Sequence, residues 1–407
     1  DIASAGVLDY VTGWYIKASQ YIKGTKIKVA FVSTNSISQG EQVGILWNEL
    51  FNKYKIKIHF AHRTFSWDSE ARGKAHVHVV IIGFANFDTN NKKLLDYEDV
   101  KGEPHEINVK NINPYLIEGK DIVILKRNDP LTDNIPKMMF GSKPVDNGNF
   151  LFTDDQKGHF LENEPGAKKF FKPLLSSKEF LNGEKRWCLW LVDSSPSELK
   201  ELPLVMERIK NVKDFRLQSK KEPTKEAANY PAIFAEIRRV KNNFLLVPLV
   251  SSERRKYIPM GFFDDNYIAN NSCSIIPDIT LYHFGVLTSE MHMVWMKYVC
   301  GRLESRYRYS NTLVYNNFPW PETPNKAMIK KVEEKAQAVL NTRKEFAEST
   351  LADLYDPNTM PPKLVKAHLE LDKTVDACYG KTSFTDEKTR IAYLFELYEK
   401  HIHKKLI

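Results

Sequence analysis

The chain has few cysteines and no long hydrophobic run. Its four cysteines, Cys188, Cys273, Cys300 and Cys378, lie far apart and form no Cys-x-x-Cys pair. This spacing argues against a disulfide framework and favours reduced, mostly buried thiols in a cytoplasmic protein. No apolar stretch is long enough to cross a bilayer, and the first residues lack the order of a secretory signal peptide. We therefore expect no association with membranes.

A glycine-rich phosphate-binding turn is also missing. Apolar spacing predicts helices near residues 7–22 and 40–54 and strands over 27–35, 55–62 and 75–84. The last strand follows without a crossover helix, so we expect it to pair antiparallel to its predecessor, at the edge of an otherwise parallel sheet. Three strands without a nucleotide-binding turn predict only the second half of an α/β domain. Because the chain opens on Asp1 instead of methionine, we interpret it as a piece of a longer polypeptide.

Positive charge is concentrated in the middle of the chain. At 407 residues with 42% hydrophobic content, the chain is long and apolar enough for two or three folded domains. Lys and Arg outnumber Asp and Glu by 59 to 51, and residues 200–260 alone hold fourteen cations against seven carboxylates. Such a segment suits a polyanion, although a solvated basic face is a common alternative. Arg254, Arg255 and Lys256 follow one another at a predicted turn, where they could contact a phosphate backbone.

The region between the first sheet and residue 322 is rich in loops. Its predicted elements are a polar connector at 86–114, short strands at 121–125 and 187–192, a basic helix at 199–221 and two strands around the turn at Asn242. Beyond it, residues 323–407 predict three amphipathic helices, with Thr385 as the N-cap of the last and Gly380 just past the end of the second. We expect these helices to brace the middle of the chain.

The stretch 300–321 alternates charged and aromatic side chains. On a strand, Arg306 and Arg308 would face one side and Tyr307 and Tyr309 the other; on a helix, the four would fan around one turn. In either case one set can be buried while the other faces a partner. Arginine donates two parallel hydrogen bonds to a phosphate or to a guanine edge. Two alternatives remain, namely an ordinary surface strand and an RNA-binding surface on which the two tyrosines stack bases.

Three groups of motifs give the chain a resemblance to a known family. They are residues 8–22 with 31–42, the motif Phe60-Ala-His-Arg-Thr-Phe-Ser-Trp67 with residues 77–84, and the stretch 300–321 with its flanks 284–293 and 354–362. Over nearly its whole length, the sequence resembles the C-terminal part of single-chain type II restriction–modification enzymes. Their methyltransferase is an adenine-specific (N6) DNA methyltransferase of the amino, or gamma, class.

The resemblance implies a multi-domain α/β architecture. Residues 1–88 would be the C-terminal half of a class I methyltransferase Rossmann-like sheet, residues 89–322 a mixed α+β target-recognition domain, and residues 323–407 a helical region. The family's S-adenosylmethionine turn and its Asn-Pro-Pro-aromatic motif do not occur in this sequence. The parent protein is thus expected to use S-adenosylmethionine on double-stranded DNA. Without the N-terminal part of the same polypeptide, this chain is expected to bind no cofactor, to hold no catalytic residue and to be inactive alone.

The resemblance also gives roles to individual side chains. Phe65, or its neighbour Trp67, matches the aromatic residue that stacks on the extruded adenine. Such a base needs a flat apolar partner to offset an unstacking cost on the order of a few kcal/mol. The alternative is that Phe65 packs under a loop.

The positions that read base pairs match Glu304, Arg306 and Arg308, with Asn271 and Ser272 nearby. Their chemistry suits the role, because Arg pairs with guanine, Glu with cytosine and Asn with adenine. The predicted contacts to the DNA backbone are Arg254, Arg255, Lys256 and Arg302.

Other sites have weaker support. His76 and His78 share one face of a strand, but no third ligand stands at a useful spacing, so we expect no metal. Asp278 resembles the start of a nuclease motif, yet Glu333 and Lys335, which would complete it, fall in a predicted helix. The alternative function is a separate, non-catalytic DNA-binding subunit that sets sequence specificity.

Overall fold

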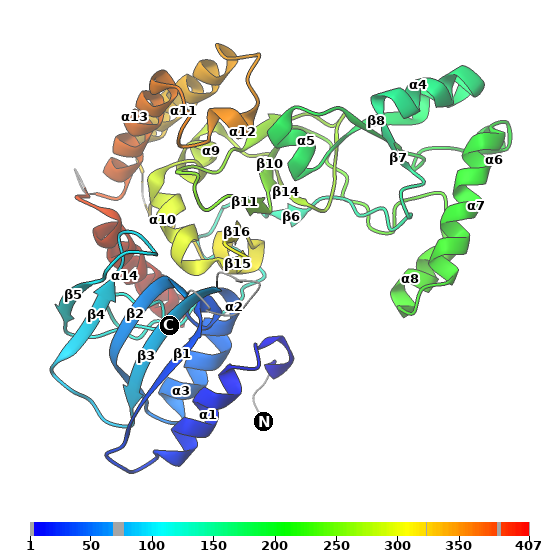
Figure 1. The fold of residues 1–407 in the computed structure, drawn as a ribbon. Coiled ribbons are helices and arrows are strands. Elements are labelled where there is room, and N and C mark those ends of the chain that lie inside the picture. Colours follow the sequence, from blue (N-terminus) through cyan, green and yellow to red (C-terminus); the bar gives the residue numbers. More distant parts are fainter. Residues whose placement is uncertain (1–3, 68–76, 323, 381–383, 407) are drawn as a thin grey trace.

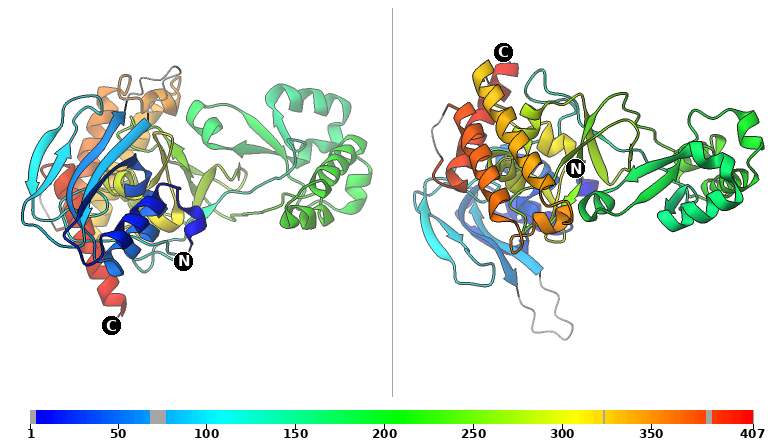
Figure 2. Two further views of the ribbon diagram at one scale, coloured as in Figure 1. Left: turned by 60° about the horizontal axis from the view of Figure 1, so that its bottom comes forward. Right: turned by 90° about the horizontal axis from the view of Figure 1, so that it is seen from above.

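The computed structural model describes residues 4–67, 77–322, 324–380 and 384–406. A sheet with its helices lies at one end, a central body adjoins it, and an arm projects from the body (Figure 1). The long helices of the C-terminal region pack along the body, on the side away from the arm (Figures 1 and 2). The predicted multi-domain α/β architecture with a closing helical region is confirmed.

Five strands form the first sheet, in the order β1-β3-β2-β4-β5. They are β1 (Lys28–Thr34), β2 (Lys57–Trp67), β3 (Val77–Ala85), β4 (Lys92–Asp96) and β5 (His105–Val109). β3 pairs antiparallel with both β1 and β2, which confirms the predicted pairing. Its predicted place at the edge is wrong, because β3 lies between the other two strands. Its nearly continuous apolar run is the pattern that a strand inside a sheet requires.

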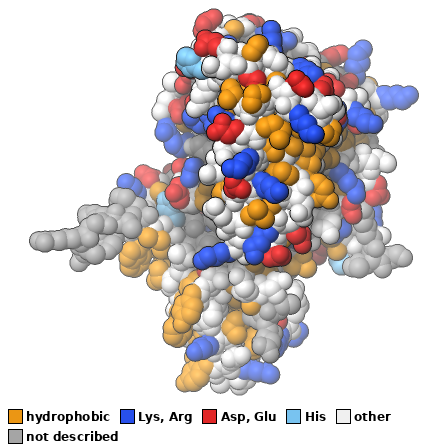
Figure 3. Space-filling model, turned by 90° about the vertical axis from the view of Figure 1, so that its right-hand side faces the viewer, with side chains coloured by type: hydrophobic (Ala, Val, Ile, Leu, Met, Phe, Trp, Pro, Cys, Tyr) orange, Lys and Arg blue, Asp and Glu red, His pale blue; other side chains and the backbone are white. Residues whose placement is uncertain are grey.

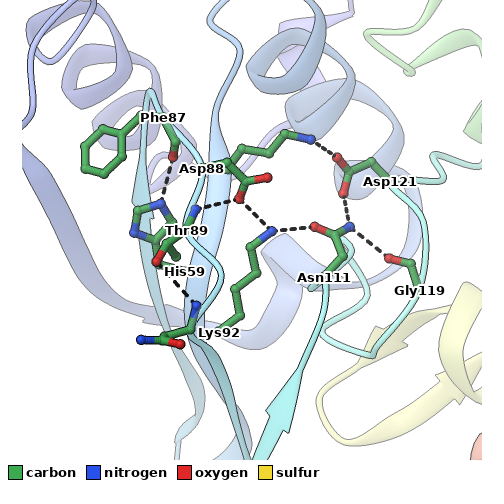
Figure 4. Close-up of polar contacts among 10 residues, drawn as sticks. His59, Phe87, Asp88, Thr89, Lys92, Asn111, Gly119 and Asp121 are labelled. Atoms are coloured by element: carbon green, nitrogen blue, oxygen red, sulfur yellow. Dashed lines mark hydrogen bonds and ion pairs between the residues drawn. The ribbon is translucent and has the colours of Figure 1, made fainter.

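The connector predicted over residues 86–114 is also wrong, because this segment contains β4 and β5. β4 pairs parallel with β2, and β5 pairs antiparallel with β4. The lysines and acids of this segment made its strands look like a polar loop in the sequence. Lys92 of β4 is an example, because its charged side chain is only 2% exposed. Its Nζ lies 2.8 Å from Asp88 Oδ1 and donates to Asn111 Oδ1 at 2.8 Å (Figure 4). Asn111 and Lys57 both donate to Asp121, so this network fastens the sheet to the segment leading into the body (Figure 4).

The two helical segments predicted in the first region are present. The first is α1 (Thr12–Tyr21), which begins five residues later than the apolar spacing indicated. The second is one helical stretch made of α2 (Gly40–Gln42), η3 (Val43–Trp47) and α3 (Asn48–Asn52). Tyr15, Trp47 and Phe84 form an aromatic core between these helices and the sheet, with Tyr15 stacked on Phe84 at a centroid distance of 5.4 Å.

Three small sheets build the body and the arm. The first sheet of the body has the order β12 (Gly261–Phe263), β10 (Phe244–Pro248), β14 (Cys273–Pro277) and β6 (Met139–Phe140). The second sheet of the body has the order β11 (Val250–Ser251), β16 (Arg306–Arg308) and β15 (Gly301–Leu303). The sheet of the arm has the order β13 (Ile268–Ala269), β8 (Phe171–Leu175), β9 (Arg186–Leu189) and β7 (Leu151–Thr153). The strand predicted at 187–192 is present as β9. No strand forms at 121–125, where Ile122 and Ile124 are buried without pairing. The strand predicted before Asn242 is likewise absent, and only an isolated bridge between Lys143 and Glu236 occurs there.

The arm has its own hydrophobic core, and helices cover its sheet (Figures 1 and 2). These helices are α4 (Asp154–Asn163), η4 (Pro165–Phe170), α6 (Pro196–Lys200), α7 (Pro203–Leu217), α8 (Glu222–Glu226) and η5 (Ala227–Asn229). Viewed from the side of the arm, hydrophobic side chains gather in a band among Lys and Arg side chains (Figure 3). The exposed apolar residues of α7 are Met206, Phe215 and Leu217.

The remaining helices belong to the body and to the C-terminal region. They are α5 (Ser177–Asn182), α9 (Leu281–Leu287), α10 (Glu290–Val299), η6 (Asn311–Tyr315), α11 (Lys326–Lys344), α12 (Leu351–Leu354), α13 (Pro362–Cys378) and α14 (Glu387–Leu406). The three predicted C-terminal helices are therefore confirmed as α11, α13 and α14. The N-cap of α14 is Asp386, whose carboxylate accepts from Thr389 N at 2.8 Å, and not Thr385. Gly380 follows α13 with φ +74°, as predicted.

All four cysteines are buried free thiols, which confirms the prediction from their spacing. Burial raises the pKa of Cys300 to about 11, so this thiol stays protonated. In the part of the chain that the structure describes, no helix combines the length and the apolar character needed to span a bilayer.

Candidate nucleic-acid interface

The alternating stretch forms a hairpin of β15 and β16. The turn between the strands contains Glu304, whose φ is +59°. Arg306 and Arg308 are exposed, whereas Tyr307 and Tyr309 are only 4% and 3% exposed. The predicted alternation is thus confirmed. The burial of both tyrosine rings rejects the alternative in which they stack RNA bases.

The hairpin positions predicted to read bases are open to a partner. Arg306 Nη2 lies 2.8 Å from Glu304 Oε2, and the two side chains are 45% and 77% exposed. An exposed ion pair of this kind contributes only about 0–1 kcal/mol. Glu304 and Arg306 can therefore give up their ion pair and contact base edges instead at a small cost in free energy.

Arg302 has a different environment from the other cations predicted to contact the backbone. Its guanidinium lies 3.9 Å from the centroid of the Tyr307 ring and donates to Ser305 O at 3.1 Å and Lys297 O at 3.3 Å. These bonds fix the hairpin to the end of α10. The geometry favours a role in positioning the hairpin over a contact with phosphate.

Asn271 and Ser272 lie next to the hairpin, although about thirty residues separate them from it in the sequence. Tyr309 N donates to Leu249 O at 2.8 Å, and Leu249 N donates to Ser272 O at 3.2 Å. Ser272 Oγ accepts from Ser177 N, so this hydroxyl is already used inside the body. The side chain of Asn271 makes no hydrogen bond to any residue that the structure describes.

The basic turn lies beyond β11, the strand that pairs with β16. Arg254 and Lys256 are exposed, and Lys256 Nζ lies 5.5 Å from the centroid of the Tyr257 ring. Arg255 is half-buried, and burial lowers the pKa of its guanidinium despite the nearby Asp356. Arg254 and Lys256 are therefore better placed than Arg255 to meet a phosphate.

Phe65 and Trp67 end strand β2. The ring of Phe65 is half-buried and stacks on Tyr97, with centroids 5.0 Å apart and 16° between the planes. The Tyr97 hydroxyl lies 2.7 Å from His62 Nδ1, and burial lowers the pKa of His62. Trp67 is 47% exposed, with its ring 6.2 Å from that of Phe65. Tyr97 went unnoticed in the sequence because it lies in the polar segment mistaken for a connector.

A cleft of about 780 Å³ opens beside Tyr97. Arg63 and Tyr97 line it from the first sheet, Tyr298 and Arg302 from the body, and Lys388 from α14. The cleft therefore brings together all three parts of the chain around the end of β2. Of these lining residues, only Arg302 was among the predicted site residues.

The two histidines weighed for a metal are only partly covered by the described residues. Across the described ranges, no group of three or more His, Cys, Asp or Glu side chains is placed to hold a metal ion. His76 lies outside the described residues, and His78 lies in β3. Glu333 and Lys335 lie within α11, as expected from their spacing.

Comparison with known proteins places these features in a family. Residues 1–96 match the model described as MmeI, DNA-methyltransferase domain; residues 118–322 match MmeI, target recognition domain; and residues 324–406 match MmeI, C-terminal domain. The chain belongs to the MmeI family. The resemblance stated from its motifs is thereby confirmed.

Two similar proteins show how much of a longer relative the chain represents. It is 40% identical over 399 residues to DNA methyltransferase A of Bacillus subtilis (strain 168), covering 98% of this chain and 44% of that protein. It is 49% identical, with a TM-score of 0.93, to the solved structure of the Type IIL restriction–modification enzyme MmeI in complex with DNA. That match covers 99% of this chain and 54% of the other. The chain thus spans about half the length of the relatives it matches.

Proposed function

We propose that the chain is the DNA-recognition portion of an S-adenosylmethionine-dependent, site-specific DNA adenine-N6 methyltransferase of a restriction–modification system. The observation that carries the proposal is the hairpin of β15 and β16, which exposes Glu304, Arg306 and Arg308 within the segment that matches a target recognition domain. The structural relative was solved in complex with DNA, which supports double-stranded DNA as the partner.

The side chains divide the work in this proposal. Glu304, Arg306 and Arg308, which are exposed, and Asn271, which is half-buried, read base edges in a groove, because their donors and acceptors suit guanine, cytosine and adenine. Arg254 and Lys256 contact phosphates and set the register without reading sequence. Arg302 holds the hairpin in shape.

Phe65, with Trp67 beside it, stacks on the adenine that is extruded to accept the methyl group. Tyr97 already covers one face of Phe65, so the base would meet the opposite face or the ring edge. Stacking of this kind contributes about 1–3 kcal/mol per base, which is comparable to the cost of unstacking the base from the duplex.

The N-terminal part of the same polypeptide would supply S-adenosylmethionine binding and the Asn-Pro-Pro-aromatic motif. β1 is an end strand of the described sheet, and Val32 on it is 49% exposed. Tyr10 just before α1 and Tyr21 at its end are 87% and 76% exposed. An open strand edge and exposed apolar groups in the same region suit further strands of one sheet. Alone, the chain would bind DNA in the cytoplasm without catalysing methylation.

The proposal is tested by expressing the complete polypeptide in cells that lack adenine methylation and by mapping modified bases in their DNA. We expect N6-methyladenine at one position of a single recurrent sequence. Methylated cytosine, or no methylated base in cells that contain the folded protein, would overturn it. In the second case, sequence-selective duplex binding by the same protein would favour a non-catalytic specificity subunit.

A further inference from the structure

A half-buried arginine, Arg63, lines the cleft and contacts the first sheet and the body. Arg63 Nη1 lies 2.7 Å from Asp96 Oδ1, and Arg63 Nη2 donates to the Tyr298 hydroxyl at 2.9 Å. Asp96 also pairs with Lys388 of α14 at 3.0 Å. A single charged cluster therefore joins β2, β4, α10 and α14.

The position of Arg63 gives this cluster its importance. Arg63 lies two residues before Phe65 on β2. Tyr298 lies in the last turn of α10, directly before the hairpin that carries Arg306. The guanidinium of Arg63 thus connects β2, which carries Phe65, with α10, which leads into the hairpin of β15 and β16.

Arg63 and Asp96 stay ionised although both are partly buried. Burial opposes the charge of Arg63, but Tyr298 and Asp96 outweigh it, and the pKa of the guanidinium is raised. Burial would likewise raise the pKa of Asp96, but Arg63 and Lys388 overcome this and lower it. The planar fork of arginine holds two acceptors in one fixed geometry, which a lysine cannot reproduce. The contact between Arg63, Asp96 and Tyr298 therefore has one fixed geometry and does not act as a pH-dependent switch.

Neighbouring contacts fix α10 and the hairpin relative to Arg63. Lys297 Nζ lies 2.6 Å from Glu387 Oε2, and Arg302 donates to Lys297 O. A change at the hairpin therefore reaches Tyr298 through one helical turn and a short loop, without a flexible linker.

We infer that Arg63 and Tyr298 are a positioning pair, which couples engagement of the base sequence by the hairpin to extrusion of the adenine beside Phe65. The inference rests on the proposed function and adds to it a link between reading and extrusion. Neither residue touches a base in this account. Each acts by holding Phe65 and the hairpin at a fixed separation.

A purely structural ion pair makes a different prediction from a coupling pair. Loss of a structural contact lowers the thermal midpoint and weakens binding and methylation together. Loss of a coupling contact leaves duplex binding intact and lowers only the steps that follow it. The variant Tyr298→Phe separates these cases, because it removes one hydroxyl and keeps the buried ring.

The experiment uses the complete polypeptide, a duplex containing its mapped site and permanganate, which oxidises the thymine left unpaired when its partner adenine is extruded. For Tyr298→Phe we expect duplex affinity within about twofold of the unaltered protein and a roughly tenfold loss in both permanganate reactivity and kcat, the effect of one hydrogen bond to a charged group. Arg63→Lys should give a loss of similar size. In the double variant the losses should not add, because the two side chains act through one contact.

Tyr379→Phe is the matched control, since it removes a buried hydroxyl that donates to Pro319 O at 3.1 Å, outside the cleft. We expect it to match the unaltered protein in extrusion and kcat. If Tyr298→Phe also matches the unaltered protein, or if affinity and kcat fall together, the inference is overturned while the proposed function stands. If the unaltered protein methylates its site without making the thymine reactive, base extrusion and this inference both fail.

Discussion

Gly40 and Gly301 meet backbone to backbone, where a β-carbon on Gly40 would lie only 2.7 Å from the Cα of Gly301. Gly40 begins α2 of the first region with φ +60°, and Gly301 begins β15 of the hairpin. No side chain fits between them. The hairpin is therefore held directly against the region that carries Phe65.

Gly40→Ala should separate these two backbones. The new methyl group meets main-chain atoms that cannot rotate away, and the left-handed conformation adds about 1–2 kcal/mol of strain. We expect the thermal midpoint of the chain to fall by several degrees. Gly13→Ala is the control, because no atom lies within 4 Å of a β-carbon there and α1 tolerates alanine. Equal midpoints for the two variants would contradict the close approach.

Arg216 should stabilise the arm by linking α7 to neighbouring backbone segments. Its side chain is fully buried and donates to the carbonyls of Pro144, Val145, Ala227, Tyr230 and Ile233. Lysine cannot reach all five acceptors, and each buried carbonyl left without a donor costs about 1–3 kcal/mol. Arg216→Lys should accelerate amide hydrogen exchange in α7 and leave β3 protected. Lys210→Ala, on the exposed side of the same helix, should change neither, and equal exchange in both variants would refute the role.

Asp372 should make the stability of the chain depend on pH. It accepts from Tyr257 Oη at 2.6 Å and from Glu290 N at 2.7 Å, and burial raises the pKa of its carboxyl to about 7. A raised folded-state pKa means that the folded chain binds the proton more tightly than the unfolded chain, whose ordinary value is about 3.9. Its contribution to the free energy of unfolding therefore decreases as the pH rises from about 4 to about 7.

The measurement is the thermal midpoint of the chain and of Asp372→Asn at about pH 5 and about pH 8. Because aspartate ionises across this window and asparagine does not, the thermal midpoint of the unaltered chain should fall relative to that of the variant as the pH rises. A difference that stays constant with pH would contradict the shifted carboxyl. Other groups titrate in both proteins and cancel in the comparison.

Arg254 should contribute affinity without specificity. A phosphate contact releases counterions, so Arg254→Ala should reduce the slope of log affinity against log salt by about 0.9 on every duplex. Lys344→Ala, an exposed change in the C-terminal region, should leave the slope unaltered. Loss of affinity on one sequence alone would instead give Arg254 a part in reading bases.

Local sequence patterns predicted the helices and strands that depend on residues close together in the sequence. The alternation at residues 306–309 indicated that one pair of side chains is buried and the other exposed, because a strand repeats every two residues. The C-terminal helices were likewise visible in their apolar spacing, with an error of one residue at the N-cap of α14.

The features that were missed depend on contacts between distant residues. β3 is inserted between β1 and β2, and no local pattern encodes strand order. β4 was hidden because Lys92 is buried with Asp88 and Asn111 as partners, and a lysine reads as exposed until its partners are known. Tyr97 and the pair of Arg63 with Tyr298 emerged only once the sheet and α10 were placed together.

The most direct measurement is the sequence that the complete polypeptide methylates when it carries Arg306→Ala. If the hairpin reads bases, discrimination should fall by roughly 1–3 kcal/mol at a single base pair, so the mapped site becomes degenerate at that position and unchanged elsewhere. Methylation of the original sequence at a lower rate, with every position still required, would contradict the account.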